Sequence, residues 1–104
     1  MTDKRILLGK KIKEIRTKRG FTQEYFSELI NIDTSTLSNI ENGKGYPSMQ
    51  TLFNIIECFC IDPKYIFDFE YLKDDIFLEK EMMEKIKTLS HEKKQLLYKI
   101  IMQF

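Results

Sequence analysis

The sequence is poor in the residues that support catalysis and metal binding. It contains one histidine, two cysteines and no tryptophan in 104 residues. It also has no Gly-rich phosphate loop and no nucleophile beside a general base. Cys58 and Cys60 lack the second pair or the histidine cluster that would complete a zinc site, and His91 stands alone. We therefore expect no enzymatic activity, no cofactor and no bound metal.

Long apolar runs, proline and glycine are also scarce. No run of apolar residues is long enough to span a bilayer and no secretory signal is present, which favours the reducing cytoplasm and no membrane partner. There are two prolines and four glycines, and β-branched residues do not alternate over any long stretch. The sequence therefore predicts an all-α fold with a compact domain large enough to bury a core.

The net charge of +1 conceals a strong asymmetry. Up to Thr22, only Asp3 and Glu14 oppose eight basic residues, namely Lys4, Arg5, Lys10, Lys11, Lys13, Arg16, Lys18 and Arg19. A basic end beside an acidic remainder is compatible with nucleic-acid binding. A solvated, lysine-rich helix face explains the same pattern, so the charge alone does not decide.

The spacing of apolar residues predicts five helices between residues 4 and 67. The first spans Lys4–Arg19 and ends at Gly20, and Asn31 closes the second. The residues expected to cap the later helices are Thr22, Asp33, Ser48 and Asp62. The residues expected to form the apolar faces are Leu8, Ile12, Ile15, Phe26, Leu29, Ile30, Leu37, Ile40, Leu52, Ile55, Ile56 and Phe59, and the short fifth helix carries Ile66 and Phe67.

A helical tail is predicted after an acidic and aromatic connection from Asp68 to Asp75. Its last segment, capped by Ser90, carries an apolar stripe composed of Leu96, Leu97, Ile100, Ile101 and Phe104. Such a stripe must pack on the protein's own core or on a partner, and both alternatives remain open. We expect a domain of residues 1–68 and a tail of residues 69–104 that serves oligomerisation or partner binding.

The helix predicted after Asp33 has an unusual outer surface. Leu37 and Ile40 suffice to pack it against its neighbours, and its other residues before Glu41 are short and polar, namely Thr34, Ser35, Thr36, Ser38 and Asn39. An ordinary solvated face would carry long charged side chains. Short hydrogen-bonding groups suit a helix that lies against base edges in the major groove. A polar helix that is merely exposed is the alternative.

Residues Gly9 to Phe67 resemble the Cro/C1-type helix-turn-helix family. The matching residues are Ile12, Ile15, Arg16, Gly20, Phe21, Thr22-Gln23-Glu24, Phe26, Ile32, Leu37-Ser38, Ile40-Glu41-Asn42-Gly43-Lys44, Pro47-Ser48 and Leu52. Ser27 departs from the family's Ala, and Asn31 and Cys60 depart from its Gly. The resemblance implies a five-helix lambda-repressor-like domain followed by a helical extension. It also implies a sequence-specific DNA-binding transcriptional regulator, a repressor that binds a two-fold operator on double-stranded DNA as a homodimer.

The resemblance also implies roles for individual residues. Base contacts would come from Thr34, Ser35, Asn39 and Gln23, and Gln23 could touch phosphate instead. Phosphate contacts would come from Thr22, Thr36, Ser38, Asn42 and Lys44. Arg16 and Glu41 would form a structural ion pair, and the apolar stripe of the tail would form the dimer interface. A function of another class remains open, that of an antitoxin or interaction module whose tail binds a protein partner.

Overall fold

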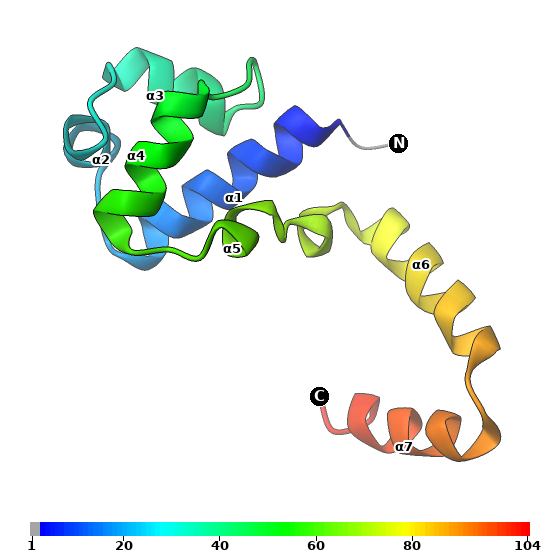
Figure 1. Ribbon diagram of the computed structural model, residues 1–104. Coiled ribbons are helices and arrows are strands. Elements are labelled where there is room, and N and C mark those ends of the chain that lie inside the picture. Colours follow the sequence, from blue (N-terminus) through cyan, green and yellow to red (C-terminus); the bar gives the residue numbers. More distant parts are fainter. Residues whose placement is uncertain (1–2) are drawn as a thin grey trace. The chain divides into compact units, whose positions relative to one another are not determined.

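The computed structural model describes residues 3–104, which form seven α-helices and a short 3-10 helix, with no strand in that range (Figure 1). The elements are α1 (Lys4–Lys18), α2 (Gln23–Leu29), α3 (Thr34–Glu41), α4 (Met49–Phe59), α5 (Pro63–Phe67), η1 (Glu70–Leu72), α6 (Asp75–Thr88) and α7 (His91–Ile101). The predicted all-α fold class is confirmed. The chain divides into two compact units, one that ends at Lys73 and one of Asp74–Phe104.

The helix boundaries follow the caps that the sequence provides. The side chains of Thr22, Ser48 and Ser90 accept hydrogen bonds from backbone N–H groups in the first turns of α2, α4 and α7. Gly20 and Asn31 end α1 and α2 with φ angles of 71° and 60°. Asp33 differs from the expectation, because it occupies the N-cap position of α3 but its side chain accepts no capping hydrogen bond.

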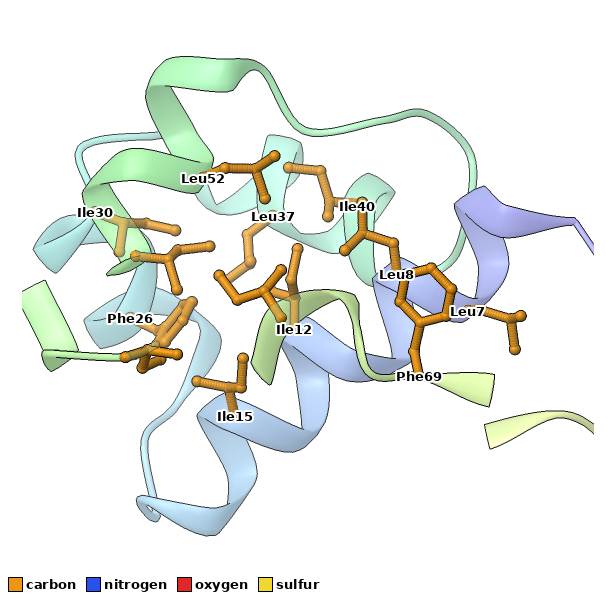
Figure 2. Close-up of a cluster of buried hydrophobic side chains, with 13 residues drawn as sticks. Leu7, Leu8, Ile12, Ile15, Phe26, Ile30, Leu37, Ile40, Leu52 and Phe69 are labelled. Atoms are coloured by element: carbon orange, nitrogen blue, oxygen red, sulfur yellow. The ribbon is translucent and has the colours of Figure 1, made fainter. Parts of the chain in front are cut away.

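The core of the first unit lies between α1, α3 and α4 and is extended by α2 and α5. Figure 2 shows Leu8 and Ile12 of α1 lying toward Leu37 and Ile40 of α3 and Leu52 of α4. The buried apolar residues are Leu7, Leu8, Ile12, Ile15, Phe26, Ile30, Leu37, Ile40, Leu52, Ile55, Ile61, Ile66 and Phe69. Most of the predicted inward positions are therefore confirmed.

Leu29, predicted on the apolar face of α2, is exposed instead, and so is Phe67 of α5. Leu29 is 39% exposed and Phe67 is 55% exposed. Both lie at the last residue of a short helix, α2 with seven residues and α5 with five. Such a helix turns only a narrow stripe toward the core, and Phe26 and Ile66 already occupy it.

The interpretation of residues 68–75 as a connection was wrong for its first half. Phe69 is 8% exposed and belongs to the core, and η1 lies against α1. The Lys11 ammonium is buried 3.7 Å from the centroid of the Tyr65 ring and donates to the Tyr71 hydroxyl at 2.7 Å. That hydroxyl in turn donates to Glu14 Oε2 at 2.7 Å. These contacts extend the first unit beyond residue 68, as far as Lys73.

The second unit consists of two helices without a core of their own. Neither α6 nor α7 contains a buried residue. Ile76 is 76% exposed, Leu96 is 60% exposed and Phe104 is fully exposed. The tail therefore leaves its apolar side chains in contact with solvent within one chain. No helix of residues 3–104 has the length and apolarity that a bilayer crossing requires.

Cys60 offers a test of backbone strain at the end of α4. It caps that helix in the left-handed region, with φ 52° and ψ 45°, where an L side chain costs about 1–2 kcal/mol. We expect Cys60→Gly to raise the free energy of unfolding by up to about 1 kcal/mol in urea denaturation, since glycine relieves this strain at some cost in chain entropy. The matched variant Cys58→Gly, inside α4, should lower it by about 0.5–1 kcal/mol. Shifts of the same sign at both positions would contradict this account.

Candidate nucleic-acid interface

Helices α2 and α3 form a helix-turn-helix joined by a tight turn. Asn31 takes its left-handed conformation in this turn, and the N–H of Ile32 donates to the carbonyl oxygen of Ser27 at 3.0 Å. The buried Ser27 hydroxyl bonds the Glu24 carbonyl oxygen at 2.9 Å and lies 3.2 Å from Thr34 Oγ1. Serine in place of the family's alanine therefore adds a hydrogen bond between the two helices.

The two faces of α3 have different environments. Leu37 and Ile40 are 0% and 4% exposed and pack into the core. Ser35 and Asn39 are exposed on the outer surface, as is Thr36. Thr34 and Ser38 are half-buried. The short polar side chains thus form an accessible surface that is backed by apolar packing.

The residues expected to contact phosphate lie in three places: Thr36 and Ser38 within α3, Thr22 and Asn42 at helix ends, and Lys44 in the loop after α3. The Thr22 hydroxyl already accepts the N–H of Tyr25 at 3.1 Å, which fixes the start of α2. Asn42 caps the end of α3, and its Nδ2 donates to Ser38 Oγ at 3.4 Å. Lys44 is exposed, and its backbone N–H donates to the Asn39 carbonyl oxygen at 2.9 Å. The loop therefore holds the backbone of Lys44 at the end of α3 and leaves its side chain exposed.

Arg16 of α1 and Glu41 of α3 form a buried ion pair. Arg16 Nε donates to Glu41 Oε2 at 2.7 Å and Arg16 Nη2 donates to Glu41 Oε1 at 2.9 Å. The two side chains are 11% and 2% exposed. Hydrogen bonds to Glu41 raise the pKa of the Arg16 guanidinium, so it stays charged. The guanidinium also donates to the Phe21 carbonyl oxygen at 2.8 Å and so ties the turn after α1 to the same pair.

Gln23 adds to this ion pair a contact that the sequence did not reveal. Its Nε2 donates to Glu41 Oε1 at 3.0 Å, and the side chain is half-buried. The Glu41 carboxylate thus accepts hydrogen bonds from both Arg16 and Gln23. Gln23 and Glu41 are separated by 18 positions, and no local spacing pattern predicts their contact. The complementary chemistry of a carboxamide and a carboxylate is the one signal that could have suggested it.

The basic residues near the N-terminus are chiefly engaged within the chain. The Lys4 side chain pairs with Glu70, and Lys10 Nζ donates to the Leu72 carbonyl oxygen at 3.3 Å. Arg5 pairs with Asp3 and Lys18 with Glu14, besides the contacts of Lys11 and Arg16 given above. The Arg19 guanidinium lies 5.0 Å from the centroid of the Phe59 ring. The basic excess of this segment therefore does not mark a phosphate-binding surface by itself.

The buried pair predicts a large effect of removing one partner. We expect Glu41→Ala to lower the free energy of unfolding by about 3–5 kcal/mol, because it leaves the Arg16 guanidinium buried and unpaired. Replacing both partners, in Arg16→Met/Glu41→Leu, should cost far less, because no uncompensated charge remains. Thermal and urea denaturation of the three proteins measure this difference. Equal losses in the single and double variants would contradict the argument.

Comparison with known proteins agrees with this geometry. A helix-turn-helix family model matches residues 12–66, more than half of the chain. The chain is 32% identical over 92 residues to the HTH-type transcriptional regulator ImmR of Bacillus subtilis, a match that covers 82% of this chain and 69% of ImmR. It is 35% identical over 53 residues to the HTH-type transcriptional activator BcrR of Enterococcus faecalis, covering 51% of this chain and 26% of BcrR.

Among solved structures, the restriction-modification controller protein C.AhdI of Aeromonas hydrophila shares the fold. It superposes with a TM-score of 0.57 at 24% sequence identity, over 61% of this chain and 96% of C.AhdI. An uncharacterised HTH-type transcriptional regulator of Archaeoglobus fulgidus is 34% identical over 64 residues, covering 60% of this chain and 91% of that protein. The matched segment, the exposed polar face of α3 and the shared fold lead to one conclusion: the chain belongs to the Cro/C1-type helix-turn-helix family of DNA-binding transcriptional regulators.

Proposed function

We propose that this regulator binds a two-fold operator as a homodimer and represses transcription by occupying promoter DNA. The observation that carries the proposal is the exposure of Ser35 and Asn39 on α3, which Leu37 and Ile40 anchor in the core. Repression by occupancy requires only that the protein bind the operator through such a surface. The match to the activator BcrR is confined to 26% of that protein and carries no argument on the sign of regulation.

The base contacts would come from α3 and from the start of α2. The Asn39 carboxamide can bond adenine through both of its polar atoms, and the Ser35 hydroxyl can donate or accept. The Thr34 methyl group can pack on a thymine methyl while its hydroxyl stays near Ser27. Gln23 would add a contact from the first residue of α2.

The phosphate contacts would fix the register of the protein on the duplex without reading sequence. The residues that we assign to this role are Thr22, Thr36, Ser38, Asn42 and Lys44. Each carries a hydroxyl, an amide or an ammonium group, and the backbone of four of them lies within or at an end of α2 or α3. Lys44 lies in the loop three residues after the end of α3 and contributes the one full positive charge of this set.

The dimer would form through α7, because one module contacts too few base pairs for high specificity. Two-fold dimers of helix-turn-helix proteins contact half-sites about one helical turn apart. Leu96, Ile100 and Ile101 are 60%, 48% and 48% exposed, and Leu97 is half-buried. Together with Phe104, this stripe is the surface that we assign to the second subunit. A protein partner of another kind on the same stripe is the second candidate.

The base-contact assignment predicts a selective loss of specificity. We expect Ser35→Ala/Asn39→Ala to lower affinity for a selected duplex site by at least about 30-fold while binding to random duplex is retained, because each of the two lost base contacts costs about 1–3 kcal/mol. Selection from random duplex DNA identifies the site, and titrations at fixed salt measure both affinities. The control is Gln95→Ala, which alters an exposed amide in the second unit.

The control should leave both affinities unchanged. Equal loss of specific and non-specific binding in the double variant, with its helical content intact, would contradict the assignment of these residues to base edges. A selected motif without two-fold symmetry would contradict the dimeric operator.

The proposed dimer predicts a charge-sensitive association through α7. We expect Ile100→Glu to yield a folded monomer in sedimentation, because the carboxylate would be buried in the interface without a partner. Its neighbour Lys99→Glu should remain dimeric, since a charged side chain already occupies that position. A dimer that persists in Ile100→Glu would exclude this stripe as the interface. A wild-type chain that is already monomeric would contradict the homodimer and favour the second candidate.

A further inference from the structure

We infer that Glu41 is a positioning residue for DNA recognition, which fixes the atoms that Gln23 presents to a base. The inference rests on the proposed function, because it requires that Gln23 reach a base edge. It gives the buried ion pair a role in sequence specificity beyond the stability of the fold.

The chemistry of the contact determines the orientation of the Gln23 carboxamide. An ionised carboxylate only accepts hydrogen bonds, so the amide nitrogen must face it. The reversed orientation would place Gln23 Oε1 against Glu41 Oε1, at the position where Nε2 now donates at 3.0 Å. Two acceptors in contact beside a carboxylate that is 2% exposed would repel each other strongly. The amide therefore keeps one orientation.

Glu41 itself is held in place by a second interaction. Arg16 contacts both of its oxygens, at 2.7 Å and 2.9 Å, in the bidentate geometry that restrains carboxylates most firmly. The acceptor that restrains Gln23 is thus fixed on the end of α3, while Gln23 starts α2. Ordering of the Gln23 side chain is completed before DNA binds, which reduces the entropy that binding must overcome.

The fixed orientation restricts which bases Gln23 can recognise. One N–H is committed to Glu41, and Oε1 with the second N–H remains for DNA. In the major groove an acceptor beside a donor matches the N6 amino group and N7 of adenine. Guanine presents two acceptors, O6 and N7, and would require two donors. We therefore expect Gln23 to select adenine and to disfavour guanine at its position, and this selectivity to depend on Glu41.

A double-mutant cycle tests the dependence. Gln23→Ala is measured in the wild-type background and in Arg16→Met/Glu41→Leu, in which the charges are replaced by apolar side chains so that none is left unpaired. Affinities are measured on the selected site and on a site with adenine replaced by guanine at the position that Gln23 specifies. We expect Gln23→Ala to cost about 10-fold on the selected site in the wild-type background and less than about 3-fold in the apolar background.

Asn39→Ala is the matched control. The Asn39 side chain lies on the exposed face of α3, away from the buried pair, so its loss should cost the same factor in both backgrounds. If Gln23→Ala costs the same factor in both backgrounds, Glu41 does not act through Gln23 and the inference fails. If both substitutions lose their effect in the apolar background, the pair holds the whole of α3, and the specific role of Glu41 fails. A wild-type chain that selects no site contradicts the proposed function and the inference with it.

A measurement on the unmodified protein covers the case in which the apolar variant does not fold. Side-chain amide signals in NMR should show slow hydrogen exchange for Gln23 and fast exchange for the exposed Gln95, because one Gln23 hydrogen is bonded to a buried carboxylate. Equal and fast exchange at both residues would overturn the inference whatever the variants do.

Discussion

The close approach of α1 to the last turn of α3 is the constraint on which the structure depends. Gly9 lies in α1 where a methyl group would collide with the Ile40 carbonyl oxygen, so only glycine permits this packing distance. Seven residues further along α1, Arg16 reaches Glu41. A glycine in a helix interior costs about 0.5–1 kcal/mol relative to alanine, which close packing at this position offsets. The two contacts together fix the position of α3 on α1.

A helix held in this way needs few apolar residues to be ordered. Leu37 and Ile40 are the apolar core residues of α3, the buried Glu41 pairs with Arg16, and the other positions carry short polar side chains. Rigid support is what a base-reading helix needs, because hydrogen bonds to base edges depend on exact placement of donors and acceptors. If α3 reads bases as proposed, the ion pair and the glycine support it from within the fold, although neither lies on its outer surface.

Local signals in the sequence predicted the fold well and the long-range contacts poorly. Caps such as Thr22 and Ser48, and the left-handed Asn31, act on their nearest neighbours, so residue type alone marks them. The contact of Lys11 with Tyr71 joins residues 60 positions apart and leaves no periodic pattern. The exposed face of α3 was predictable because short polar residues fill it. The link from Gln23 to Glu41 was not, because Glu41 already had an evident partner in Arg16.

The charged side chains near the N-terminus are largely paired within the first unit. Lys4, Lys10 and Lys11 hold the segment that ends this unit, and Arg16 is buried, so few cations remain for phosphate. Each phosphate contact makes the slope of log affinity against log salt concentration steeper by about one unit. A surface that makes few such contacts therefore has low non-specific affinity. Linking two modules raises affinity without new contacts per module, because the second binding event becomes intramolecular. A tail that has no core of its own and exposes an apolar stripe is suited to supply that link.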